Sequence, residues 1–149
     1  MDDAAKPRLV GFNHVALEVG DIDAALDFYG GIFAFTLRGR GRNSAFIDLG
    51  DQFLALSAGR TQGPDAARHL GLVVDDKGRA RRHLERLGVE LLPGDGVEFR
   101  DPWGNRIQLV DYQNIQFSKV PAVLAAMGLG ELRKNEAAER EIQEKFGSG

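Results

Sequence analysis

Cysteine is absent from the 149 residues of this chain. This excludes disulfide bonds, thiolate nucleophiles and thiolate-bound metals, so any metal ion would need histidine, carboxylate, amide or water ligands. The sequence also has no run of about 18 apolar residues that could cross a bilayer. Its N-terminal segment carries acidic residues and no apolar stretch, unlike a secretory signal peptide. We therefore expect a cytoplasmic protein.

The chain also has no excess of positively charged residues. The formal net charge is -3 at pH 7, so no basic field would concentrate nucleic acid or anionic lipid at the surface. We expect no nucleic acid and no membrane partner, and instead a small molecule or another protein. The length suits one globular domain with a real core and is too short for two independent domains.

What the sequence does contain is an internal repeat. When His14 is aligned on His69, a shift of 55 residues (69 − 14), similar apolar and acidic residues coincide through the first half of each copy. The shift then falls to 53, as it would if one hairpin loop were shorter. The two copies span about residues 8–58 and 67–113.

Each copy begins with alternating apolar and polar residues, the pattern of a strand with one buried face. An acidic residue that can cap a helix follows, Asp21 or Asp23 in the first copy and Asp75 or Asp76 in the second, and then apolar residues at helical spacing. Three short strands complete each copy, and we expect them at 35–37, 44–49 and 52–57, and at 89–92, 96–100 and 106–112. The pattern predicts an α+β fold of two βαβββ modules.

The turns and the faces of the strands can also be predicted. Gly50-Asp51 suits a tight hairpin, and the run from Asp101 to Gly104 suits a type I turn. Alternation places His14 and His69 on the face of each sheet that is turned away from the helices. Ala55 and Gln108, in the last strand of each copy, should point the same way.

This arrangement resembles the vicinal oxygen chelate superfamily, the group of glyoxalases, bleomycin resistance proteins and extradiol dioxygenases. The residues that carry the resemblance are the two opening strands, the segment Ala24–Tyr29 and the closing run Asp101–Leu109. The resemblance implies two sheets that curl into a cup, a divalent metal (iron, manganese, nickel or zinc) in the cup, and a homodimer in many members. The resemblance covers roughly residues 8–113, and we expect a domain over residues 1–117 followed by a helical extension over 118–149.

Carried over position by position, the metal ligands of the family fall on His14, Ala55, His69 and Gln108. Alanine cannot bind a metal, and a neutral set of two histidines and a glutamine leaves the charge of the ion uncompensated. The candidate metal ligands are therefore His14, His69 and Gln108. Each has an alternative interpretation, the histidines as packed strand residues and Gln108 as a polar wall of the cavity.

Other residues have less specific patterns. Glu18 shares the face of His14 and is the candidate general base, or else a solvated residue at the rim. Arg38, Arg40 and Arg42 alternate with glycines and suit either a basic ligand clamp or a charged hairpin edge. His83 lies among arginines and indicates a solvated helix.

After Tyr112 the composition changes, and the sequence predicts a short apolar helix through Met127 and a charged helix over 131–146. These helices would pack on their own domain or form a dimerisation arm.

Three functions remain open at this stage. The first is a metal-dependent lyase, isomerase or dioxygenase, and the second is a metal-free protein that binds an aromatic or cationic small molecule. The third is an association module that acts through its C-terminal arm.

Overall fold

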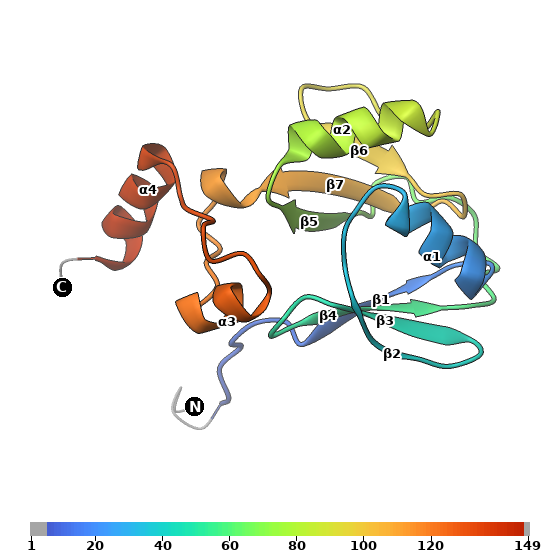
Figure 1. Ribbon diagram of the computed structural model, residues 1–149, viewed down its shortest axis with the longest axis horizontal. Coiled ribbons are helices and arrows are strands. Elements are labelled where there is room, and N and C mark those ends of the chain that lie inside the picture. The colour runs from blue at the N-terminus through green and yellow to red at the C-terminus, as the bar shows by residue number, and fades with distance from the viewer. Residues whose placement is uncertain (1–5, 148–149) are drawn as a thin grey trace.

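The structure is a computed structural model that describes residues 6–147. Residues 1–5 and 148–149, at the outer ends of the predicted domain and extension, lie outside the described residues. The first module comprises the strand β1 (His14–Glu18), the helix α1 (Ile22–Gly30) and the strands β2 (Leu37–Arg40), β3 (Ser44–Asp48) and β4 (Phe53–Ser57). They form a four-stranded sheet in the order β1-β4-β3-β2, in which β1 is parallel to β4 (Figure 1).

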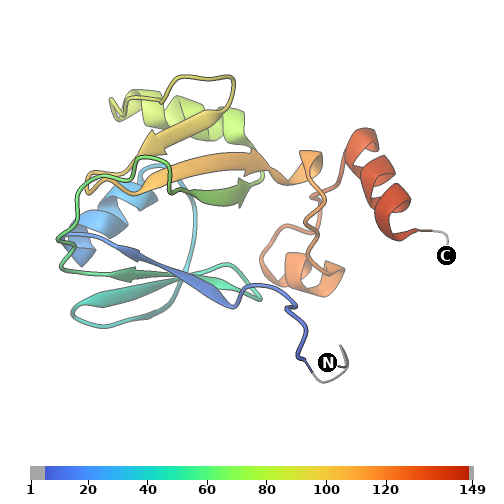
Figure 2. The ribbon, with the colours of Figure 1, turned by 180° about the vertical axis from the view of Figure 1, so that it is seen from behind.

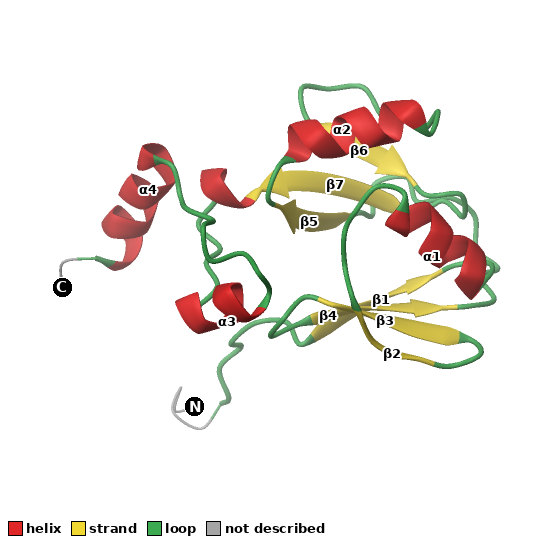
Figure 3. Cartoon of the chain, viewed as in Figure 1, coloured by secondary structure: helices red, strands yellow, loops and turns green. Residues whose placement is uncertain are grey.

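The second module repeats this topology with β5 (Leu70–Val74), α2 (Lys77–Arg86), β6 (Val97–Arg100) and β7 (Arg106–Asp111). Its three-stranded sheet has the order β5-β7-β6, and β5 is parallel to β7 as β1 is to β4. The prediction of two βαβββ-like modules with C-terminal helices is therefore confirmed. Figure 3 shows the two sheets as separate elements of the molecule, with α2 lying along the second.

Two predicted strands differ from the structure. Residues 89–92 form a single bridge, between Leu91 and Phe99, instead of a full strand. Pro93 follows directly and has no N–H to continue the pairing, which limits this edge. In the first module β2 begins at Leu37 and not at 35, with a register shift between Leu37 and Gly39.

Acidic caps start both module helices. The carboxylate of Asp21 accepts a hydrogen bond from the N–H of Ala24 at 2.9 Å, and Asp76 accepts one from Arg79 at 3.0 Å. Of the two aspartates predicted for each helix, Asp21 is the cap of α1 and Asp76 is the cap of α2. Both residues have extended backbones, as is usual at a helix N-cap.

One hydrophobic core joins the modules. The apolar faces of the strands pack against the helices, and residues from both copies, such as Leu56 and Ile107, are fully buried. The ring of Phe28 on α1 lies 6.1 Å from that of Phe99 on β6. The opposite face of each sheet, called the free face below, is therefore the only face left for polar residues to occupy.

The C-terminal extension contains a 3-10 turn (Tyr112–Asn114), α3 (Pro121–Ala126) and α4 (Glu136–Phe146). α3 packs on the β3–β4 turn, where an added Cβ at Gly50 would meet Met127 and Val123 within 3 Å. The ammonium of Lys134 donates to the carbonyl oxygens of Tyr112 and Ile115, at 2.6 and 2.7 Å, and to that of Phe117. The first part of the extension is therefore tied to its own domain.

The charged helix is shorter than predicted, because Asn135 caps it through a 2.8 Å bond from Ala138 N–H and residues 131–135 remain outside it. Figures 1 and 2 both show α4 at one end of the molecule, apart from the sheets. Among the helices of residues 6–147, none has both the length and the apolar character that a membrane span requires.

Candidate functional site

His14 begins β1 on the free face of the first sheet and is exposed. Its ring stacks on Phe53 of β4 at 4.7 Å, with 10° between the ring planes. Its Nδ1 lies 2.7 Å from the side-chain oxygen of Asn13. That oxygen can accept a proton from Nδ1, an arrangement that would leave Nε2 as the nitrogen available to a metal.

His69 directly precedes β5 and is held in the same way. Its Nδ1 lies 2.9 Å from the carbonyl oxygen of Ala67, which can accept a proton from this nitrogen. A histidine that binds a metal through one nitrogen commonly donates its other N–H to an oxygen. The contacts of both repeat-related histidines are therefore compatible with metal binding through Nε2.

The remaining two family positions also lie on the free faces. Ala55 pairs with Ala16 on one side and Phe46 on the other, and its side chain is only 7% exposed. The position that the family resemblance predicts for a metal ligand is therefore filled by the buried methyl group of Ala55. Gln108 pairs with Gly71 and Glu98 and is half-buried, so its amide is available on this face.

Glu98 is a carboxylate on this face that the sequence interpretation missed. It stands directly across from Gln108 on β6, and both of its oxygens accept from Arg106, each at 2.9 Å. These hydrogen bonds hold the pKa of Glu98 below its usual value, against the opposite effect of its desolvation. The alternation of Glu98 with the apolar residues Val97 and Phe99 was the sequence signal that could have placed it on this face. Because Arg106 binds both oxygens of the Glu98 carboxylate, this group is not available as the carboxylate ligand that Gln108 fails to supply.

A polar cavity of about 220 Å³ lies between β1 and the start of β5, and both Glu18 and His69 line it. The carboxylate of Glu18 accepts from the side-chain amide of Gln62 at 3.1 Å. The structure thus brings the predicted base and one predicted metal ligand to the same cavity, but neither His14 nor Gln108 lines it.

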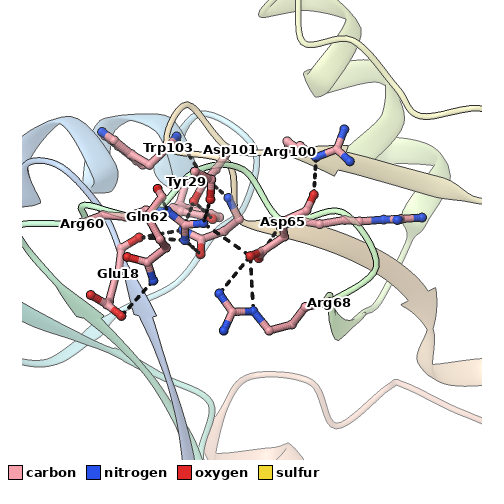
Figure 4. Close-up of polar contacts among 12 residues, drawn as sticks. Glu18, Tyr29, Arg60, Gln62, Asp65, Arg68, Arg100, Asp101 and Trp103 are labelled. Carbon is pink, nitrogen blue, oxygen red and sulfur yellow. Dashed lines mark hydrogen bonds and ion pairs between the residues drawn. The ribbon is translucent and has the colours of Figure 1, made fainter.

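A hydrogen-bonded network closes this cavity and joins the modules (Figure 4). Its centre is Arg60 in the linker between the modules, whose side chain is 3% exposed. Arg60 donates to the carbonyl oxygen of Gly63 at 2.8 Å and to the side-chain oxygen of Asn105, and it pairs with Asp65. Asn105 in turn donates to the backbone oxygen of Glu18 at 2.9 Å. Sequence periodicity gives no signal for a linker residue of this kind.

Asp101 anchors the second half of the network. It is 4% exposed and accepts from the Tyr29 hydroxyl at 2.7 Å, from two backbone N–H groups and from the Asn105 amide. Burial and, after it, the neighbouring carboxylate raise the pKa of Tyr29. Tyr29 therefore keeps its hydroxyl proton at neutral pH and donates it to Asp101.

The first free face carries a cation and aromatic rings. The guanidinium carbon of Arg38 lies 4.7 Å from the centre of the Phe53 ring, and Phe46 meets the same ring edge-on at 5.8 Å. Since β1 and β2 lie on opposite sides of β4, His14 and Arg38 approach Phe53 from its two sides. Of the other predicted clamp residues, Arg40 pairs with Asp23 and Arg42 is exposed.

The two histidines predicted as metal ligands line different cavities within one chain. His14 lines a second cavity together with Val74 and Asp75 at the end of β5, whereas His69 lines the polar cavity with Glu18 at the end of β1. In residues 6–147, no three histidine, aspartate or glutamate side chains cluster as metal ligands would.

The fold and the paired free-face positions define an α+β protein built from two βαβββ modules. The model of the Glyoxalase/Bleomycin resistance protein/Dioxygenase superfamily matches residues 11–109, more than half of the chain. The chain belongs to this superfamily.

Several solved structures share the fold. A protein from the mobile metagenome of V. Pseudocholerae is 24% identical, with a TM-score of 0.58 over 73% of this chain and 99% of that one. A structure of a possible glyoxalase from Bacillus cereus is 23% identical, with a TM-score of 0.57 over 68% and 99%. A variant of the fosfomycin resistance protein FosX from Listeria monocytogenes, in complex with Mn(II) and 1S,2S-dihydroxypropylphosphonic acid, is 18% identical, with a TM-score of 0.59 over 68% and 90%.

Proposed function

We propose that this chain is a metal-dependent lyase, isomerase or dioxygenase whose small-molecule cup is completed by a second copy of the chain. His14 of one copy would bind the ion together with His69 and Gln108 of the other. The observation that carries the proposal is that both repeat-related histidines have an oxygen within hydrogen-bond distance of Nδ1, at 2.7 Å for His14 and 2.9 Å for His69. An oxygen at Nδ1 orients the ring so that Nε2 could bind a metal.

The position of these residues supports a homodimer. Within one chain His14 and His69 lie in different cavities, and both free faces contain exposed residues. A second copy related by twofold symmetry would place the first free face of one chain opposite the second free face of its partner, twice. A small-molecule site would then lie between them.

The residues present suit a divalent cation in part. Two imidazoles and an amide oxygen are acceptable ligands for borderline ions such as manganese, nickel, zinc or iron(II), but without a carboxylate the affinity should be modest. When bound, the ion would act as a Lewis acid toward two neighbouring oxygens of the substrate. Glu18, on the face of His14 and oriented by Gln62, would move a proton. Phe53 and Phe46 would contact the apolar part of the substrate.

The first experiment measures metal binding. Protein purified without chelator is analysed for bound metal and titrated with Mn(II), Ni(II), Zn(II) and Fe(II) by calorimetry. His14→Ala and His69→Ala should each lose binding, while His83→Ala, the matched control on α2, should keep it. Gln108→Glu supplies the missing carboxylate and should tighten binding about tenfold or more. A wild-type protein that neither holds nor binds any of these ions would remove the proposal.

The second experiment tests the shared cup. His14→Ala and His69→Ala chains with different tags are co-expressed and the mixed dimer is isolated. One of its two sites then has every ligand intact, so unsorted dimers should recover about a quarter of the wild-type sites. Two differently tagged His14→Ala chains provide the control and should recover none. Failure of the mixed dimer to bind metal would show that the ligands do not come from two copies.

A metal-free protein that binds an aromatic or cationic molecule is the second candidate. The Arg38, Phe53 and His14 stack and the methyl group of Ala55 in a ligand position favour it. It predicts a ligand-induced stabilisation that EDTA does not change and that His69→Ala retains. Phe53→Ala should abolish the effect, because the stacking surface is lost.

A further inference from the structure

A second, larger cavity lies between the two modules, and His14 and Phe53 of the first free face are among the residues that line it. Its volume is about 520 Å³, within the range of about 300–1,000 Å³ that is typical of small-molecule sites. The walls are the beginnings of β1 and β4, the whole length of β5 and residues of the C-terminal extension. Neither Ala55 nor Gln108 lines it, and His14 is the only predicted metal ligand that does.

Most of the wall is apolar. β5 contributes Leu70, Leu72 and Val74, and the extension contributes Leu124 and Leu129, among others. The apolar side chains that line a cavity of this size lose dispersion contacts when no ligand fills it. The extension forms one complete side of it, which gives these residues a role beyond packing on the β3–β4 turn.

Two hydrogen-bond donors, Lys119 and Tyr112, lie in this mostly apolar wall. The side chain of Lys119 is 9% exposed, and its ammonium pairs with Asp51, which uses one of its three N–H groups. Tyr112 is 6% exposed, and its hydroxyl oxygen accepts the backbone N–H of Lys119 at 3.2 Å. The Tyr112 hydroxyl donates no hydrogen bond within residues 6–147. The wall therefore includes a charged donor, Lys119, and a neutral donor, Tyr112.

We infer that this cavity binds an amphipathic monocarboxylate, an alkyl or aryl acid whose carboxylate contacts Lys119 and Tyr112 and whose apolar part fills the space along β5. The spare N–H groups of Lys119 and the hydroxyl of Tyr112 match the acceptor oxygens of one carboxylate. Asp75 also lines the cavity, and Asp51 adjoins Lys119, so a second negative charge on the ligand would be repelled. The inference does not depend on the metal site proposed above.

Calorimetric titration with decanoate tests this inference, and decanol, which has the same tail without the charge, is the paired probe. We expect saturable binding of one decanoate per chain, unchanged by EDTA. Lys119→Met should weaken decanoate binding about tenfold or more, because a charge-assisted hydrogen bond is lost, and Tyr112→Phe should weaken it less. Neither change should affect decanol. Lys145→Met, which removes an exposed lysine of α4, is the matched control and should bind decanoate like the wild type.

A variant that fills the cavity separates this site from adsorption elsewhere. Val73→Trp introduces a large side chain on β5 and should abolish binding of both probes, with circular dichroism confirming that the chain is folded. Absence of saturable decanoate binding to the wild type would overturn the inference. So would decanoate binding that persists unchanged in both Lys119→Met and Val73→Trp. Loss of metal binding in the earlier experiment, with decanoate binding intact, would refute only the proposed function.

Discussion

The buried contact between Tyr29 and Asp101 offers a quantitative test of how the two modules are held together. Tyr29 belongs to α1 of the first module, is 1% exposed and donates to the Asp101 carboxylate of the second at 2.7 Å. Asp101→Ala would remove that acceptor and also leave the N–H groups of Trp103 and Asn105 without their partner.

The expected cost follows from the groups left unsatisfied. Each buried polar group without a partner costs about 1–3 kcal/mol, and the backbone groups near the surface can recover part of this from water. We expect Asp101→Ala to lower the free energy of unfolding by about 3–5 kcal/mol. Tyr29→Phe removes one hydrogen bond and leaves Asp101 its other donors, so it should cost about 1 kcal/mol.

The assay is urea denaturation followed by circular dichroism for the wild type, both single variants and the double variant. In the Asp101→Ala background the Tyr29 hydroxyl has no acceptor, so Tyr29→Phe should then be neutral or stabilising. The two changes should therefore be strongly non-additive. Equal costs of Tyr29→Phe in both backgrounds would refute the conclusion that this bond joins the modules.

Three further predictions concern other parts of the structure. Arg106 lowers the pKa of Glu98, so the stabilising contribution of the pair is complete above the ordinary glutamate value and is lost as the pH falls through the folded-state pKa. Melting temperatures between pH 3 and 6 should thus fall more steeply for the wild type than for Glu98→Gln, and parallel curves would contradict this. Gly50→Ala should destabilise by about 1–3 kcal/mol in denaturant titrations, because Gly50 has φ +85° and a Cβ there would meet the sulfur of Met127 at 2.7 Å. Lys134→Met removes the donor to three carbonyls and should speed proteolytic loss of α4 without lowering the stability of the modules; an unchanged cleavage rate would contradict it.

Much of the fold could be predicted because its signals are local. The alternation around Val15 and Leu72 has the period of a strand, and the aspartates before each helix satisfy its first N–H groups, as Asp21 and Asp76 do. The strand at 89–92 was predicted wrongly because its pairing depends on the neighbouring Phe99 and on the loop after Pro93, not on its own pattern. The charged helix was placed too early for a related reason, since only the cap at Asn135 determines where it begins.

For the candidate site, too, the local features could be predicted from the sequence and the contacts between strands could not. Period-two alternation was sufficient to put Glu18 on the free face with His14, and it would have put Glu98 beside Gln108 had it been applied to β6. It could not predict that Arg106 would neutralise that carboxylate, because the pair joins residues on two strands. Whether the predicted ligands bind a metal stays a prediction.

The two modules, their repeat and the side of each sheet on which the histidines lie could be predicted from the sequence, because these features depend on residues a few positions apart. The way in which the modules sit against each other could not be predicted from it. That placement depends on contacts between residues far apart in the chain, among them the buried Arg60 and Asn105. It separates His14 from His69 within one chain, and it creates the apolar cavity between β5 and the C-terminal extension.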